Sequence, residues 1–220
     1  MSLFASLLRD FRRTASDLPG LFSGHFCVMF LPLAPLLGDE ATLPGYYSDQ
    51  TYFCRLRETY TDPLAPYRCK KQLKAGRCVI LELDGLGSFV FTNHYHSALF
   101  QNLQRRFPGV TSYVFCSDGP GGYFKILKDG RIQRKVASYM FFEGMGSYAE
   151  TRGAPCAYEL ETGHIFKVDP KARHLREMMP DFTKWEVLDL FDYYVGLDRF
   201  KSANLRRVLV YDLERPAAKK

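Results

Sequence analysis

The clearest pattern of hydrophobic and polar positions runs from residue 77 to residue 140. Short apolar runs rich in β-branched and aromatic residues, such as RCVILEL and VTSYVFC, alternate with turns marked by glycine and aspartate, which is typical of antiparallel strands. One segment differs: HYHSALFQNLQRRF places apolar residues at helical spacing and ends before Pro108 and Gly109. The pattern therefore predicts two strands, a helix and three further strands, β-β-α-β-β-β.

Two amphipathic helices are predicted outside this region. In residues 2–13 the leucines and phenylalanines fall on one stripe and the arginines lie outside it. A later helix begins with a capping box made by Thr183 and Glu186 and continues to Val195. We expect the later helix to pack on the sheet and RRVLVYDLE to follow it as a final strand. The residues expected in the helix–sheet contact are Trp185, Leu188, Phe191 and Val195.

The glycine-rich stretch CSDGPGGYFK, residues 116–125, resembles a phosphate-binding loop in composition. Such a loop must be followed by a helix whose backbone N–H groups point at the anion. Here YFKIL follows, which is a strand-forming run. The stretch is therefore predicted to be a hairpin turn, in which the glycines supply positive φ angles.

These elements predict an α+β fold: a mostly antiparallel twisted sheet with an N-terminal amphipathic helix and a late capped helix packed on it. Residues 1–75 contain the first helix and are then interrupted by many prolines and glycines, with one strand predicted at QTYFCRLRETY, so we expect either an irregular cover over the sheet or a flexible entry to it. Residues 76–220 are expected to form the sheet domain, with the whole chain one compact unit. GAPCAYELETGHIFKVDP is predicted to be a further hairpin around Glu161 and Gly163.

Composition narrows the class of protein. The 220 residues are 46% hydrophobic, which is enough for a sizeable core. The six cysteines are widely spaced and show no C-x-x-C pair, so their thiols are expected to be reduced. The net charge is +6 without a polybasic segment, which does not favour nucleic-acid binding. The most apolar stretch, residues 21–38, is interrupted by glycines and prolines and does not predict a membrane span or a signal peptide. A cytoplasmic location without a cofactor is the expectation.

Two charged surfaces are candidate partner-binding sites. The outer face of the late helix carries Glu186, Asp189 and Asp192 with no interleaved lysine or arginine, so an acidic stripe is predicted there. The strand that follows the KDG turn carries a second, basic set. Its members are Arg131, Arg134 and Lys135.

No catalytic or metal site is predicted. His94 and His96 are two residues apart at the start of a helix and point to different sides, which is unsuitable for one metal ion. An alternative remains open in which Cys116 acts as a nucleophile with His94 or His96 in a small hydrolase or transferase.

The run from GRCVILELDG to DFTKWEVLDLFDYYVGLDRF, residues 76–200, resembles bacterial immunity proteins encoded beside secreted toxins, including those of type VI secretion loci. The resemblance lies in a strand meander followed by a late capped helix. It implies a protein that binds and neutralises a cognate toxin by direct contact, with no catalytic residues of its own. The oligomeric state is left open.

Overall fold

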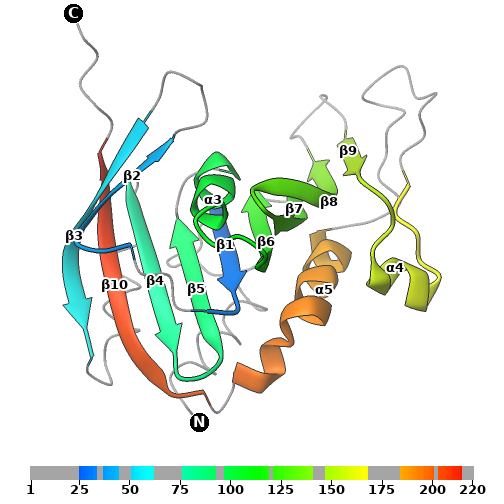
Figure 1. The fold of residues 1–220 in the computed structure, drawn as a ribbon. Helices are drawn as coiled ribbons and strands as arrows, with labels where there is room; N and C mark the ends of the chain where they lie inside the picture. Colours follow the sequence, from blue (N-terminus) through cyan, green and yellow to red (C-terminus); the bar gives the residue numbers. More distant parts are fainter. Residues whose placement is uncertain are drawn as a thin grey trace, which may run out of the picture.

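The described part of the chain forms one large antiparallel sheet in a computed structural model (Figure 1). The structure describes residues 25–33, 37–44, 51–61, 76–92, 97–118, 121–140, 147–167, 184–200 and 203–214. The strands are β1 His25–Leu31, β2 Glu40–Pro44, β3 Thr51–Tyr60, β4 Arg77–Leu83, β5 Gly87–Thr92, β6 Thr111–Asp118, β7 Gly121–Lys128, β8 Arg131–Met140, β9 Ser147–Arg152 and β10 Leu205–Glu214. The helices are α3 Ser97–Gln104, α4 Ala157–Thr162 and α5 Lys184–Val195, with a short 3-10 helix, η1, at Leu197–Phe200.

The spatial order of the strands differs from their order in the chain. It is β2-β3-β10-β4-β5-β1-β6-β7-β8-β9, so β1 lies in the middle of the sheet and β10 lies between β3 and β4. Every neighbouring pair is antiparallel. Cys27 of β1 is in register with Thr92 of β5 on one side and with Cys116 of β6 on the other.

The predicted α+β fold class is wrong. The described residues form a mostly β fold, because the unpredicted strands β1, β2 and β9 enlarge the sheet, the predicted strand in QTYFCRLRETY joins it as β3, and the α-helices are short. Sequence patterning missed β1 because all of its residues from Cys27 to Leu31 are buried, and a strand buried on both faces shows no alternation of apolar and polar positions. The helix predicted over residues 2–13 lies outside the described residues.

The hairpin predicted around Glu161 is also wrong. Residues 147–152 form strand β9 and residues 157–162 form helix α4. A capping box starts this helix: the Glu159 carboxylate accepts a hydrogen bond from the backbone N–H of Cys156, 2.8 Å long. Gly163, in the left-handed region at φ 71°, ends it.

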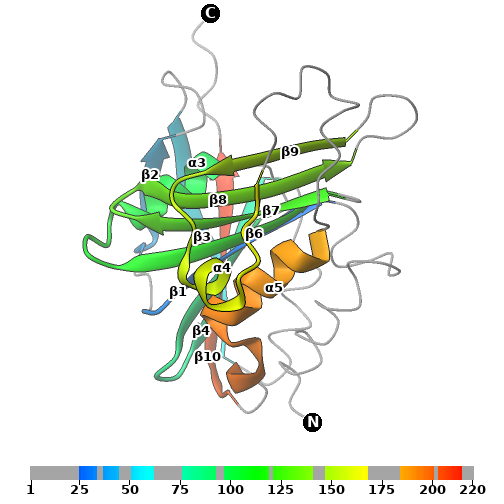
Figure 2. The ribbon, with the colours of Figure 1, turned by 90° about the vertical axis from the view of Figure 1, so that its right-hand side faces the viewer.

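Helices cover part of each face of the sheet (Figure 2). On one face, α5, η1 and the segment around α4 cover a core that includes Phe30, Phe115 and Phe124. Leu188, Phe191 and Val195 of α5 lie in this core as predicted, whereas the Trp185 side chain lies outside the described set. On the other face, Leu99, Phe100 and Leu103 of α3 lie in a second core. None of the helices that the structure describes is both long and apolar enough to cross a membrane.

Two hairpins follow the sequence prediction. Strands β6 and β7 pair through Asp118 and Gly121, and no helix follows, so the hairpin interpretation of CSDGPGGYFK is confirmed. The expected positive φ angles are not found at Gly121 and Gly122, which belong to strand β7, and residues 119–120 lie outside the described residues. The β7–β8 turn places Asp129 at φ 53° and Gly130 at φ 68°, the two positive φ angles of a type I′ turn. This turn also holds α3, because the Gly130 N–H donates to the Gln104 side chain at the end of that helix.

A buried ion pair ties α4 to the sheet. Arg134 of β8 and Glu159 of α4 are 4% and 0% exposed. The Arg134 guanidinium donates two hydrogen bonds to the Glu159 carboxylate, one of them 2.8 Å from Nε to Oε2. Arg134 also donates to the carbonyl oxygens of Gly153 and Phe166, and the Phe166 N–H donates to Glu159. The pair therefore fixes both ends of residues 153–166 against β8.

We expect Glu159→Gln to lower the free energy of unfolding by about 3–5 kcal/mol, because it leaves the Arg134 charge buried without a counter-charge. Burial favours the protonated acid, but the hydrogen bonds from Arg134 and Cys156 outweigh it and lower the pKa of Glu159. The contribution of the carboxylate is therefore complete above the ordinary glutamate pKa and is lost as the pH falls through the lowered folded-state pKa. Denaturant unfolding at pH 7 and at low pH measures both effects.

The matched control is Glu161→Gln, on the same helix but exposed, which should change stability by less than about 0.5 kcal/mol. Equal losses in the two variants would contradict a structural role for the ion pair.

Candidate partner-binding surface

Helices α4 and α5 lie side by side (Figure 2), and we call the side chains that they expose there the α4–α5 surface. It is defined by Tyr158, Leu160, Glu161, His164, Glu186, Asp189 and Tyr193. Leu160 is 67% exposed and Tyr193 is 43% exposed, and these two are the large hydrophobic side chains that the described residues leave exposed. Isolated exposed leucines are ordinary, whereas the exposed Tyr193 contacts Tyr158 and Glu161 of the neighbouring helix α4.

Aromatic contacts hold the two helices together. The Tyr158 and Tyr193 rings meet edge to face with centroids 5.3 Å apart, and the Tyr193 hydroxyl donates to the Glu161 carboxylate. Below them, the Tyr194 ring stacks between Tyr113 of β6 and Phe124 of β7, at 5.0 and 5.8 Å. Edge-to-face and offset-stacked pairs add to ordinary burial. The exposed Tyr193 is therefore held in place before any partner binds.

The surface is also acidic. Burial, together with the charges of Asp189 and Glu186, raises the pKa of Tyr158. Glu186 lies 3.8 Å from His164 Nε2, close enough to pair with this histidine when it is protonated. A negative potential around apolar anchors suits a partner that presents basic groups.

The structure separates the three members of the predicted acidic stripe. Glu186 and Asp189 belong to the α4–α5 surface. The Asp192 carboxylate instead accepts a hydrogen bond, 2.8 Å long, from the backbone N–H of Leu197 just beyond the helix. Asp192 therefore closes the C-terminal end of α5.

The predicted basic set is not brought together. Arg134 is buried against Glu159, and Lys135 pairs with Glu150 of β9. Successive residues of a strand point to opposite faces of the sheet, so Arg134 and Lys135 lie on different faces, while Arg131 is exposed near the β7–β8 turn.

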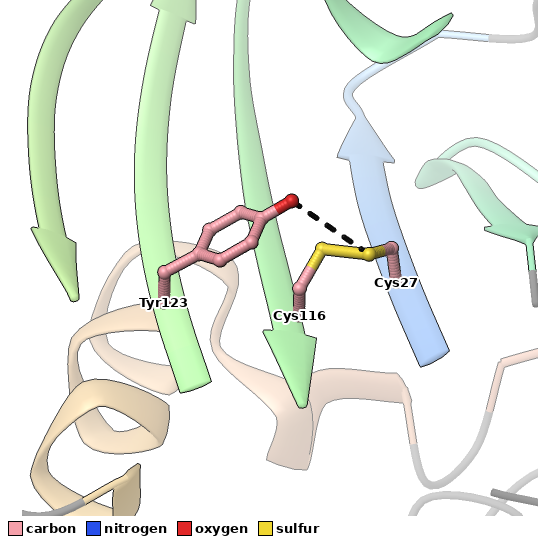
Figure 3. Close-up of a disulfide and its surroundings, with 3 residues drawn as sticks. All are labelled: Cys27, Cys116 and Tyr123. Atoms are coloured by element: carbon pink, nitrogen blue, oxygen red, sulfur yellow. Dashed lines mark hydrogen bonds between the residues drawn. A yellow bond between two sulfur atoms is a disulfide. The ribbon is translucent and has the colours of Figure 1, made fainter. Parts of the chain in front are cut away.

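Two of the cysteines form a disulfide in the middle of the sheet (Figure 3). Cys27 and Cys116 are in register on β1 and β6, and the Tyr123 hydroxyl lies 3.7 Å from the Cys27 sulfur. The expectation of reduced thiols is therefore wrong for these two residues, whereas Cys54, Cys78 and Cys156 form no disulfide and are buried. The bonded Cys116 offers no thiolate nucleophile, and His94 and His96 lie outside the described residues.

Burial raises the pKa of the free thiols Cys54 and Cys156, that of Cys54 to about 11, which keeps them protonated and unreactive near neutral pH. In the described ranges, no group of three or more histidine, cysteine, aspartate or glutamate side chains is placed to hold a metal ion. The α4–α5 surface therefore remains the best candidate for a functional site in the part of the chain described.

The comparisons with known proteins give no match: no family model, no curated protein and no solved structure is similar to this chain.

The Cys27–Cys116 bond spans 89 residues of the chain, and we expect it to stabilise the oxidised protein by about 2–4 kcal/mol. Dithiothreitol should therefore lower the denaturant midpoint of the wild type. The same reductant should leave Cys27→Ala/Cys116→Ala unchanged, since that variant has no bond to lose. A wild-type midpoint that does not respond to full reduction, verified by thiol alkylation, would show that the bond adds no stability.

Proposed function

We propose that this protein is an immunity-type inhibitor, which binds a cognate bacterial toxin directly and neutralises it through the α4–α5 surface. The observation that carries the proposal is the exposed Tyr193, which contacts Glu161 and Tyr158 on a surface that also carries Glu186 and Asp189. Aromatic side chains that are rigid before binding are frequent hot spots, and carboxylates around them speed encounter with a basic partner.

The expected partner is a toxin whose active site is basic, such as an enzyme that acts on a phosphate-bearing substrate. An inhibitor neutralises such an enzyme by covering its cationic residues with carboxylates. The rigid attachment of α4 through Arg134 and Glu159 supports this use, because a surface that is already ordered loses little conformational entropy on binding.

The first test is a pull-down from the native organism with the full chain as bait. We expect capture of a protein encoded beside this gene, with nanomolar affinity, equivalent to about 12 kcal/mol. Recovery of nucleic acid alone, released by salt, would contradict the proposal and indicate an electrostatic nucleic-acid binder.

Once the partner is identified, Tyr193→Ala should weaken binding by roughly 30-fold or more, mainly through faster dissociation, because it removes the aromatic anchor.

Glu161→Lys/Asp189→Lys should slow association at low salt and reduce its salt dependence. Asp39→Lys/Asp84→Lys changes the net charge equally at exposed positions outside the surface, and should bind like the wild type. Equal kinetics in both double variants would exclude the α4–α5 surface as the docking site.

A cytoplasmic site of action is part of the same proposal, and the Cys27–Cys116 pair provides its test. Disulfides persist mainly in oxidising compartments, so a cytoplasmic protein should carry this pair as two thiols in growing cells and form the bond only after lysis in air. Rapid lysis into excess alkylating reagent, followed by mass spectrometry, measures the ratio. A pair that is already oxidised in cells would overturn the cytoplasmic location.

A further inference from the structure

A second cluster of charged residues lies on β7, β8 and β9, on the face of the sheet that α3 covers. Lys125 of β7 is in register with Lys135 of β8, which is in register with Arg152 of β9. Residues directly opposite each other on antiparallel strands point to the same face, so three cationic side chains share one row. In the adjacent row, Tyr123 and Glu150 flank Ala137. We call Tyr123, Lys125, Lys135, Glu150 and Arg152 the Lys125 cluster.

The charges of this cluster are unevenly matched. Glu150 forms an ion pair with Lys135, whereas no carboxylate within the described ranges forms an ion pair with Lys125. The Lys125 Nζ instead lies over the Tyr123 ring, 4.3 Å from its centroid, and the Lys135 Nζ lies 6.0 Å from the same centroid. Lys125 is only 5% exposed. A buried ammonium that lies over a ring face and beside a second cation, with no ion pair to a described carboxylate, is costly to keep charged.

The groups facing Lys125 determine its protonation. Burial and, second, the positive charge of Lys135 lower its pKa to about 7, while Glu150 acts in the opposite direction. On the β6 side its register partner is the apolar Val114. A much larger share of Lys125 side chains is therefore neutral at pH 7 than for an ordinary lysine, which is neutral in fewer than about one molecule in a thousand.

Exposure increases from Lys125 toward the edge of the sheet. The Lys135 and Glu150 side chains are 15% and 34% exposed, and Arg152 on the edge strand β9 is exposed. A small molecule approaching over β9 meets Arg152 and Glu150 first and the amine last. With Lys125 neutral, the remaining charges of the cluster leave an excess of one positive charge, which matches a singly charged anion.

We propose that Lys125 is a covalent binding site for small carbonyl compounds that carry a carboxylate, such as 2-oxo acids, which it captures as an imine. A lysine desolvated beside a second cationic group is the arrangement that activates an amine for this chemistry. Lys135 and Arg152 hold the carboxylate, and the apolar surroundings of the amine restrict the site to small compounds.

The reaction balances without an oxidant or a reductant. The Lys125 nitrogen lone pair attacks the carbonyl carbon, the C=O π electrons move to oxygen, and one nitrogen proton is transferred to that oxygen to give a carbinolamine. The Lys135 ammonium then protonates the hydroxyl group, which leaves as water while the nitrogen lone pair forms the C=N bond. The remaining nitrogen proton returns to the Lys135 amine, so the sum is amine plus carbonyl giving imine plus water.

The test uses the folded full chain, glyoxylate as the probe and cyanoborohydride to trap the imine, with peptide mapping of each lysine. At pH 7 we expect Lys125 to be labelled at least tenfold faster than Lys128, which is exposed at the end of the same strand, with half-maximal labelling near pH 7. This preference should disappear in denaturant. Labelling of Lys125 no faster than Lys128 would overturn the proposal, and this measurement requires no variant.

Two variants test the role of the neighbours. Lys135→Gln removes a cation and should move half-maximal labelling to higher pH, whereas Glu150→Gln removes an anion and should move it to lower pH. Lys128→Arg is the matched control and should label at Lys125 like the wild type. Unchanged pH profiles in both cluster variants would contradict the proposed activation. Equal labelling by acetaldehyde, which has no carboxylate, would overturn the selectivity for anionic carbonyl compounds.

Discussion

The position of β1 is the constraint on which the rest of the described structure depends. This strand of seven residues is hydrogen-bonded to β5 on one side and β6 on the other, so it alone joins β2-β3-β10-β4-β5 to β6-β7-β8-β9. Its residues from Cys27 to Leu31 are buried in the two cores on the two faces of the sheet. The Cys27–Cys116 bond crosses one of the two junctions. Both faces can therefore be covered by helices only because β1 makes the sheet continuous.

The buried pair of Arg134 and Glu159 has a comparable role on a smaller scale. It converts residues 153–166, which contain one short helix, into a fixed part of the molecule, and the tyrosines of α4 and α5 then meet across the gap between the two helices. The α4–α5 surface thus rests on a salt bridge that is out of contact with solvent. The buried pair of Arg134 and Glu159 therefore determines where Tyr158 and the exposed Glu161 of α4 lie.

The local pattern of apolar, polar and turn residues was sufficient to predict the elements where strands and turns follow each other directly in the chain. Strands β4 to β8, helix α3 and helix α5 all lie where their hydrophobic periodicity and turn residues predicted them. Strand β1 was missed because burial on both faces removes the alternation of apolar and polar positions. The glycines and prolines that flank it in the sequence are also typical of a loop. Helix α4 was missed because its N-cap is a cysteine, and its capping glutamate is recognisable only once Arg134 is known to lie beside it.

The candidate site was predicted only in part for the same reason. Helical spacing identified Glu186 and Asp189, which lie on one element. Tyr193 lies on the same helix, but Tyr158 and Glu161 join them only because α4 is held beside α5, and that attachment depends on residues of β8 and α4 that are 25 positions apart. The Lys125 cluster likewise requires the register of three strands. A sequence pattern describes one helix or strand at a time, whereas the α4–α5 surface and the Lys125 cluster are each formed by several elements.

The place of β10 has a consequence for how the chain reaches this structure. Its residues lie between β3 and β4, although every other described strand precedes it in the chain. Until residues 205–214 are synthesised, the facing edges of β3 and β4 have no strand to pair with in the native arrangement. Pairings between such distant segments close large loops and make folding slow, in the range of milliseconds to seconds for sheet proteins. During translation, two exposed strand edges must therefore be kept from pairing with other chains.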